Sequence, residues 1–230
     1  MPTLRVIGPG RAGSAMSRAL GAAGWSVAPP LGRGDDLAGA AAGVDLVLIT
    51  TPDAAIAEVA RSVAPTAAVV AHCSGSLTLD VLAPHPRRAS IHPLRPMPSG
   101  DTRLAGASFA VAGDALAERV VADIGGQQLR VADADRAAYH AAACIASNHL
   151  VALLGQVERV AATAGVPLHA YFDLVRQTVD NVERLGPGRA LTGPAQRGDL
   201  ATLDRHRDAI GTDEVPGYDA MVDLCRRLVA

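Results

Sequence analysis

The sequence contains no lysine, and all 21 basic residues among its 230 are arginine. This absence excludes any mechanism that uses a lysine amine as a nucleophile or a proton donor. Aromatic residues make up only 3% of the chain, so a core must consist mainly of alanine, valine and leucine. The formal charge is only −2, and we therefore expect neither nucleic acid nor an anionic membrane as a partner.

Cysteines are also few, and Cys73, Cys144 and Cys225 lie far apart without a CxxC pair. This usage is typical of a reducing compartment. We expect no metal site, because the candidate ligands His140, Cys144 and His149 do not provide a third strong ligand at metal spacing. The first residues lead directly into a predicted strand, and we therefore expect no signal peptide. The longest apolar stretch, residues 137–155, is interrupted by polar side chains and is too polar for a membrane span. We expect a soluble, cytoplasmic protein.

Short apolar runs alternate with helical periodicity over the first 130 residues. This alternation predicts a parallel sheet with helical crossovers. The segment 84–98 is expected to form a loop, and residues 78–82 are expected to start a helix. Asp53 is expected to cap the helix 54–63. The predicted strands are 4–7, 25–28, 44–49, 68–71, 108–111 and 127–131, and the predicted helices are 12–23, 36–42, 54–63 and 116–124.

The pattern changes near residue 132, after which no strand candidate remains. The periodicity predicts four helices, at 134–164, 168–185, 194–210 and 218–229. We therefore divide the chain into an α/β domain, residues 1–132, and an all-α domain, residues 133–230.

A glycine motif, Gly8-Pro9-Gly10-Arg11-Ala12-Gly13, follows the first strand and opens the first helix. In this GxGxxG pattern, Gly8 permits a tight turn, Gly10 allows the backbone to approach a diphosphate, and Gly13 lets the helix pack close to the strand. The first N–H groups of the helix would bind the phosphates. The motif predicts a Rossmann-type doubly wound parallel sheet, with all six residues in contact with a dinucleotide.

The residue after the second strand distinguishes the two nicotinamide cofactors. Arg33 stands about 20 residues after Gly13, where NAD enzymes usually carry an acid for the ribose hydroxyls. A guanidinium there suits a 2′-phosphate, which favours NADP over NAD. Asp35 or Asp36 could be the ribose acid if the loop has a different register, so NAD stays open.

Polar residues follow several predicted strands, at the edge where ligands of open α/β sheets bind. Thr51 and Pro52 follow one strand, and we expect them beside the cofactor together with Ser74. His72 and His92 are candidate proton donors, because the pKa of histidine lies near neutrality. Ser74 could bond the substrate oxygen, whereas Cys73 is expected to be a small buried residue.

The long helix at 134–164 carries a polar stripe of His140, Cys144 and Asn148 at spacings of four. Because unpaired burial of polar groups is costly, we expect this stripe to face a cleft against the first domain. Arg197 lies at a loop-to-helix junction that could bind a carboxylate or merely cap the helix. Candidate substrate-binding residues are Arg95, Arg136 and Arg197.

With these motifs in view, the chain resembles an uncharacterised bacterial family, a Rossmann-like domain followed by a helical domain of unknown function. That family is related to pyrroline-5-carboxylate reductase, prephenate dehydrogenase, ketopantoate reductase and β-hydroxyacid dehydrogenase. The resemblance rests on the glycine motif and on residues 72–75, 90–93, 135–143, 147–148 and 193–199. It implies a C-terminal domain like that of 6-phosphogluconate dehydrogenase. It also implies a homodimer in which the helical domains of two chains pack together.

The chain departs from the related enzymes at one informative position. Ketopantoate reductase and β-hydroxyacid dehydrogenases use a lysine four residues before an asparagine; here Asn148 is present but Cys144 takes the lysine-like position. We therefore expect His92 to act in place of that lysine, supported by Ser74 and Asn148, with His140 a further catalytic candidate.

These features predict an NADP-dependent oxidoreductase that acts on a small carboxylate-bearing carbonyl, alcohol or imine, with ketopantoate-type reduction among the options. The alternative is a non-catalytic NADP(H)-binding sensor or partner protein, which the missing lysine favours. A related nucleotide or a flavin in place of nicotinamide is a third option.

Overall fold

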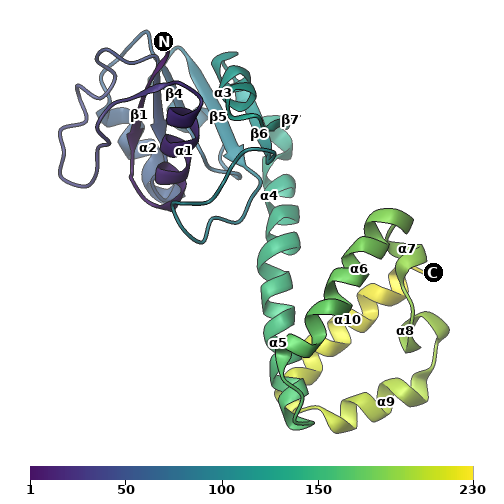
Figure 1. The fold of residues 1–230 in the computed structure, drawn as a ribbon. Coiled ribbons are helices and arrows are strands. Elements are labelled where there is room, and N and C mark those ends of the chain that lie inside the picture. Colours follow the sequence, from purple (N-terminus) through teal and green to yellow (C-terminus); the bar gives the residue numbers. More distant parts are fainter. Residues whose placement is uncertain (230) are drawn as a thin grey trace. The chain divides into compact units, whose positions relative to one another are not determined.

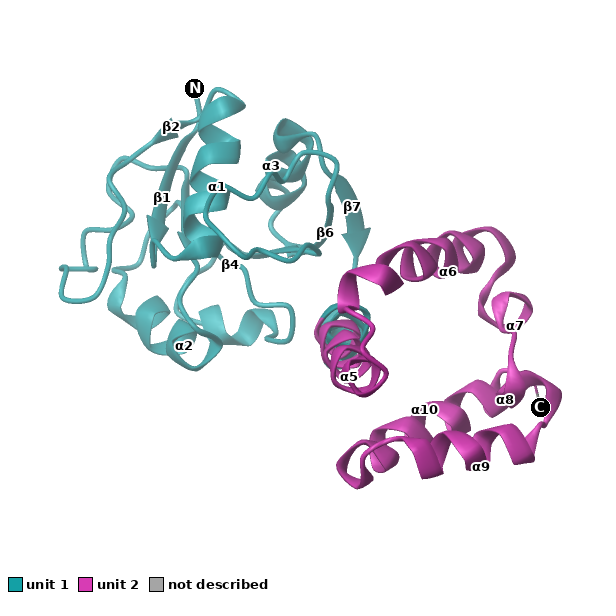
Figure 2. Cartoon of the chain, turned by 60° about the horizontal axis from the view of Figure 1, so that its bottom comes forward, with its two compact units in different colours: residues 1–147 teal, residues 148–230 magenta. Residues whose placement is uncertain are grey.

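The structure is a computed structural model that describes residues 1–229. The chain folds into two compact units, residues 1–147 and 148–230 (Figure 2). The all-α segment begins near residue 133, as the sequence predicts, whereas the compact units divide later, within the long helix. The domain boundary at 132/133 stays a prediction.

The first unit contains a seven-stranded sheet in the order β2-β1-β3-β4-β5-β6-β7 (Figure 1). All neighbouring strands are parallel except β5 and β6. Because β2 and β3 lie on opposite sides of β1, strand order reverses there, which makes the edge beyond β1 and β3 the expected ligand site. The strands are β1 (Thr3–Ile7), β2 (Ser26–Val27), β3 (Leu46–Ile49), β4 (Val69–His72), β5 (Arg88–Pro93), β6 (Ser108–Gly113) and β7 (Gln127–Arg130).

Helices cover both faces of this sheet, each on an apolar cluster of its own. The helices α1 (Arg11–Ala22) and α3 (Leu116–Ile124) bury Met16, Leu20 and Val120 against one face. The opposite face packs against α2 (Asp53–Ser62) and the 3₁₀ helix η1 (Leu79–Leu82). The central strands β3 and β4 are buried throughout, as continuous apolar runs in a covered parallel sheet should be. The predicted Rossmann-type fold class is confirmed.

Residues 133–163 form one continuous helical segment with a π-helical turn in the middle. It comprises η2 (Asp133–Asp135), α4 (Arg136–Cys144), the π-helical η3 (Ile145–His149) and α5 (Leu150–Thr163). By length and composition alone this helix could cross a membrane, since its most apolar 18-residue stretch has a mean hydropathy of 1.3 and is not buried in the structure; one such helix is weak evidence for a membrane span. Within the first unit, Tyr139 and His140 contact His92 through their rings, so its first turns pack on protein.

The rest of the second unit is helical as well, and residues 148–229 contain no strand. The helices are η4 (Leu168–Tyr171), α6 (Phe172–Leu185), α7 (Pro187–Ala190), α8 (Pro194–Arg197), α9 (Leu200–Ala209), η5 (Thr212–Glu214) and α10 (Val215–Arg227). The predicted helix 194–210 is divided in two, because Gly198 takes a left-handed φ of 70° and ends α8.

Three other local predictions were wrong. Residues 36–42 form turns, since the Asp36 carboxylate accepts from the N–H of Ala38 and glycines interrupt this short segment. The proline-rich segment 84–98 contains strand β5, whose prolines stand at or beyond its ends. Asp53 begins α2 but does not cap it, and its carboxylate binds serine hydroxyls instead.

Candidate functional site

The glycine motif joins β1 to α1, and each glycine meets a different steric demand. Gly8 has a φ of 96°, and a Cβ there would lie 2.9 Å from the backbone nitrogen of Thr51. A Cβ on Gly13 would lie 2.5 Å from the carbonyl oxygen of Gly8. A Cβ on Gly10 would meet nothing within 4 Å, so the protein alone does not require glycine there. Open space above Gly10 fits the close approach of a ligand.

The groups around this motif suit a dinucleotide. The N–H groups of Arg11, Ala12 and Gly13 are the first of a 12-residue helix that has no side-chain cap, so they are free to bind an anion. The hydroxyl of Thr51, two residues after β3, is buried without a partner among residues 1–229. These residues fit a diphosphate and its neighbouring ribose.

Arg33 lies beside the same motif. The chain after β2 stays paired with β1, since the carbonyl of Leu31 accepts a hydrogen bond from the N–H of Gly8 at 2.8 Å. A Cβ on Gly32 would lie 3.8 Å from Cδ of Pro9, and the exposed Arg33 follows directly. The carboxylate of Asp35 accepts from the N–H of Gly32 at 2.7 Å, and this bond occupies one of its oxygens within the turn. The arrangement favours Arg33 as the ribose-phosphate residue.

The turn after β4 is held by side chains from three other segments. The hydroxyl of Ser74 donates to Asp53 at 2.7 Å and accepts from the N–H groups of Ser76 and Leu77. The N–H of Ser74 donates to Nδ1 of His72 at 3.2 Å. Because its one proton and both lone pairs are in use, the buried Ser74 hydroxyl has no capacity left for a substrate oxygen. This geometry favours a structural role for Ser74 over the predicted catalytic one.

Arg136 also supports this turn. Its side chain is fully buried, and it pairs with Asp133 at 3.0 Å and donates to the carbonyl of Ser74 at 3.4 Å. Asp133 in turn accepts from the N–H of Leu79. A buried guanidinium in this position neutralises Asp133 and fixes the backbone, which favours a structural role over the predicted contact with substrate. Its Nη2 atom is buried without a partner.

Gly75 allows two imidazole rings to press against the same turn. A Cβ there would lie 2.5 Å from Nδ1 of His140 and 2.9 Å from Nε2 of His92, so any side chain would displace both. The two rings meet edge to face, with centroids 5.7 Å apart. The structure therefore brings together His92 on β5 and His140 on α4, two of the predicted catalytic candidates, and their part in catalysis stays a prediction.

Tyr139 completes the cluster, and its hydroxyl lies 2.8 Å from Nδ1 of His92. Burial lowers the pKa of His92 to about 4, with the nearby His140 and Arg136 acting in the same direction. Burial, followed by the charge of Arg136, lowers the pKa of His72 to about 4 as well. Both histidines are therefore neutral at pH 7.

The remaining predicted residues fall into two groups. Arg95 is exposed just after β5, and its Nη1 donates to the carbonyl of Arg103 at 3.0 Å. Asn148 and Arg197 are exposed and belong to the second compact unit. Their roles stay predictions. Burial raises the pKa of the Cys73 thiol to about 12, as expected for a small residue packed on the core.

Sequence reasoning missed Tyr139 and Gly75 as site residues. Tyr139 is not part of the polar stripe of His140, Cys144 and Asn148. It contacts His92 because Tyr139 and His140, which are adjacent on α4, both pack against the His92 ring. Gly75 was visible in the motif after β4, but only its contacts reveal why glycine is needed. Among the described residues, no group of histidine, cysteine and acidic side chains could hold a metal ion.

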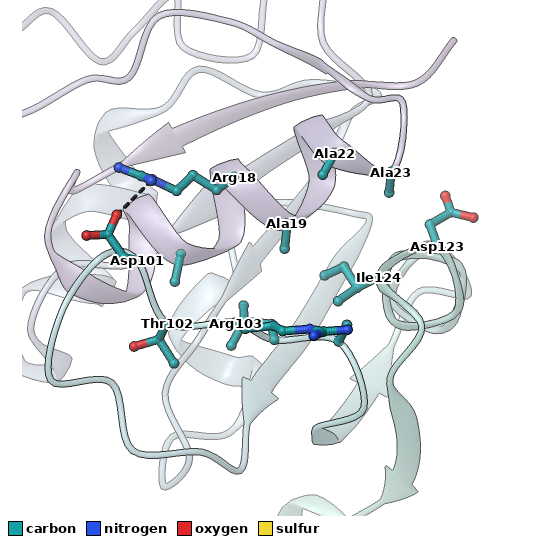
Figure 3. Close-up of a pocket in the computed structure, with 12 residues that line it drawn as sticks. Arg18, Ala19, Ala22, Ala23, Asp101, Thr102, Arg103, Asp123 and Ile124 are labelled. Atoms are coloured by element: carbon teal, nitrogen blue, oxygen red, sulfur yellow. Dashed lines mark ion pairs between the residues drawn. The ribbon is translucent and has the colours of Figure 1, made fainter.

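A cavity of about 340 Å³ lies elsewhere, between α1 and residues 101–105 (Figure 3). Arg18 and Asp101, which both line it, form an ion pair. Asp123, also in the lining, accepts a hydrogen bond from the indole of Trp25. Its lining contains none of the predicted site residues, and alanine side chains of α1 form much of it. It is not a candidate for the predicted chemistry.

Two family models match the chain. The model described as "Domain of unknown function (DUF2520)" covers residues 108–224, and the one described as "Rossmann-like domain" covers residues 34–96. The chain belongs to the DUF2520 family. A comparison with curated proteins finds no match.

Several solved structures share the fold over nearly the whole chain. Protein BF3122 of Bacteroides fragilis, named as a candidate NADP oxidoreductase, aligns with a TM-score of 0.80 and 19% identity, covering 99% of this chain and 97% of that one. A reductive aminase from Aspergillus terreus, solved with NADPH, aligns with a TM-score of 0.74, 14% identity and coverage of 99% and 94%. Plasmodium falciparum pyrroline carboxylate reductase, with NADP bound, aligns with a TM-score of 0.65 and 11% identity, covering 100% of this chain and 98% of that one. The resemblance to the pyrroline-5-carboxylate reductase group is thus confirmed at the level of fold.

The lowered pKa values of His72 and His92 make the stability of the first unit depend on pH. Each histidine binds fewer protons in the folded state than in the unfolded state. Its contribution to the free energy of unfolding is therefore fully present above the ordinary pKa of 6.5 and is lost as the pH falls toward 4. We expect a loss of about 2 kcal/mol for each histidine between pH 7 and pH 5. Urea unfolding, followed by fluorescence of the single tryptophan, Trp25, measures this loss.

The variant His92→Gln should lose less stability over this interval than the wild type, by about 2 kcal/mol. The variant His169→Gln, changed in the second unit, is the control and should follow the wild-type curve. Equal losses for wild type and His92→Gln would show that His92 does not titrate with a lowered pKa.

Proposed function

We propose that this chain is an NADP(H)-dependent oxidoreductase. The observation that carries the proposal is the glycine motif at the point where strand order reverses, with open space above Gly10 and uncapped N–H groups at the start of α1. When bound there, the cofactor supplies or accepts a hydride. The residues proposed to hold it are Gly8, Pro9, Gly10, Arg11, Ala12, Gly13, Arg33, Thr51 and Pro52.

Arg33 sets the proposed preference for NADP over NAD. It is exposed beside the glycine motif, whereas Asp35 is engaged in a bond to the turn. A guanidinium can form two parallel hydrogen bonds to a 2′-phosphate. The names of BF3122, the reductive aminase and the pyrroline carboxylate reductase, each with NADP or NADPH, support the same choice.

His92 is the proposed catalytic residue. Its Nε2 has no hydrogen-bond partner among the described residues and is not one of the buried unpartnered atoms, so it reaches the surface. A neutral imidazole there can donate one hydrogen bond to a substrate oxygen or nitrogen. Since the chain has no lysine, this role falls to histidine or tyrosine.

The proposed substrate is a small carboxylate-bearing carbonyl, alcohol or imine. Arg95 follows β5 three residues after His92, and Nη2 of its exposed guanidinium has no hydrogen-bond partner among the described residues, which leaves it available for a carboxylate. The reductive aminase and the pyrroline carboxylate reductase are named for reactions of imines, which favours an imine within this class.

We predict that the chain binds NADPH more tightly than NADH and that Arg33→Gln removes the preference. Loss of charge-assisted bonds to the 2′-phosphate should weaken NADPH binding by about 10- to 100-fold while NADH binding stays unchanged. Isothermal titration calorimetry measures both affinities. Arg61→Gln, an exposed arginine at the end of α2, is the matched control and should change neither.

If neither dinucleotide binds the wild-type chain, the proposed function is wrong. If NADPH binds but a panel of 2-oxo acids and cyclic imines produces no loss of NADPH absorbance, the sensor alternative is favoured. An absorption spectrum of the purified protein tests for a flavin.

We also propose that the second unit mediates a homodimer. Large apolar side chains are unusually exposed in this part of the chain, and a second copy is the partner that the resemblance implies. A cavity of about 500 Å³ between α5, α9 and α10 adds to this apolar surface. The exposed residues include Leu150, Val151, Leu153, Leu174, Val179, Val182, Leu200, Met221 and Leu224.

Light scattering after gel filtration, in buffer without detergent, should give twice the mass of one chain. Val151→Asp, at a side chain 69% exposed, should shift the protein toward the monomer, because an unpaired carboxylate would enter the interface. Leu129→Asp, an exposed position in β7, should remain dimeric. A wild-type monomer at all concentrations would contradict the dimer.

A further inference from the structure

Tyr139 is the group in direct hydrogen-bond contact with the proposed proton donor, and the proposed function gives it no role. Its hydroxyl lies 2.8 Å from Nδ1 of His92, and the two rings meet edge to face with centroids 5.6 Å apart. On its other side the His92 ring meets His140, and Gly75 closes the turn beneath both. These contacts leave the His92 ring little freedom to rotate.

From this geometry we propose that Tyr139 is a positioning residue for His92: its hydroxyl donates to Nδ1 and thereby holds the proton of His92 on Nε2, toward the substrate. The inference rests on the proposed function, because it specifies which ring atom serves the substrate. The hydrogen bond between Tyr139 and Nδ1 of His92 can be tested on the protein without cofactor or substrate.

Both partners of this hydrogen bond are neutral, and the phenol is the stronger donor while the imidazole nitrogen is the stronger acceptor, which supports donation from Tyr139 to Nδ1. Burial raises the pKa of Tyr139, so the phenol keeps its proton, and burial lowers the pKa of His92 to about 4, so the imidazole is neutral. A neutral imidazole has one N–H and one lone pair. When the phenol donates to Nδ1, the N–H must therefore lie on Nε2.

The pair also solves a problem that a neutral histidine presents as an acid. If Nε2 gave its proton to a substrate oxygen or nitrogen alone, the ring would become a costly imidazolate anion. When Nδ1 accepts the phenolic proton of Tyr139 in the same step, the ring stays neutral and the negative charge passes to the phenol oxygen. Water then returns a proton to Tyr139, which is exposed in part. One proton leaves the pair and one is restored.

Other charged and titratable groups face this pair, and each of them also influences the pKa of His92. They come from three elements: Asp53 on α2, His72 on β4, and Arg136 and His140 on α4. None of them lies within hydrogen-bond distance of Nδ1 of His92, so the tautomer depends on the Tyr139 hydroxyl.

The test is the tautomer and the pKa of His92, read from two-bond ¹H–¹⁵N spectra of protein labelled at histidine. His92→Gln identifies the signals. In the wild type we expect the Nε2–H tautomer from about pH 5.5 to 8. In Tyr139→Phe, which keeps the ring and removes one oxygen, we expect a tautomer mixture and a pKa raised by about half a unit to one unit.

A matched control exists in the second unit, where the hydroxyl of Tyr218 lies 2.7 Å from Nδ1 of His206. Tyr218→Phe should change the signals of His206 and leave those of His92 unchanged. A wild-type His92 with its proton on Nδ1 would overturn the proposal even if Tyr139→Phe failed to fold. So would a tautomer and pKa that are the same in wild type and Tyr139→Phe.

With a substrate in hand, kinetics give a second readout. Tyr139→Phe should lower kcat by about 10- to 100-fold with little change in KM, and adding it to His92→Gln should cause no further loss, because the two residues act as one unit. Failure to bind NADPH would refute the proposed function but leave the tautomer result intact. An unchanged tautomer in an enzyme that binds NADPH would refute the role of Tyr139 alone.

Discussion

The candidate site depends on the close approach of side chains to the backbone turn at residues 74–75. Every polar group of Ser74 is bonded by a side chain, from Asp53, His72 or Arg136, so the turn is held without regular secondary structure. Gly75 then provides a surface without a side chain, against which His92 and His140 pack. Several buried polar groups support the half-buried His92 ring, which is the organisation expected of a site whose donor must be held in place.

A second steric constraint places the other half of the site. Gly8 and Gly13 are required by contacts within the protein, whereas Gly10 is not, and that difference separates packing from binding within a single motif. Because β1 and β3 end at the same edge as β4 and β5, the glycine motif and the histidine cluster share one edge of the sheet. Parallel topology thus brings together two groups of residues that are far apart in the sequence.

Much of this arrangement was predictable from the sequence, because it follows from periodicity and from residue types with few alternatives. The glycine motif, the buried strands β3 and β4 and the helices after residue 132 all carry strong local signals. Strand β5 was harder, since prolines surround it and Ser90 and His92 interrupt its apolar run. The hydrogen bonds that engage Ser74 and Arg136 could not be predicted, because a motif names a residue but does not show which of its atoms are already bonded. Tyr139 was missed since its partner lies 47 positions away.

The most direct measurement of the central claim is a crystal structure of the protein with NADPH. We predict that the diphosphate lies on the N–H groups at the start of α1, with the 2′-phosphate at Arg33 and the nicotinamide ring at the edge of the sheet that carries His92. A diphosphate bound elsewhere, or a nicotinamide ring remote from His92 with Tyr139 turned away from Nδ1, would contradict it.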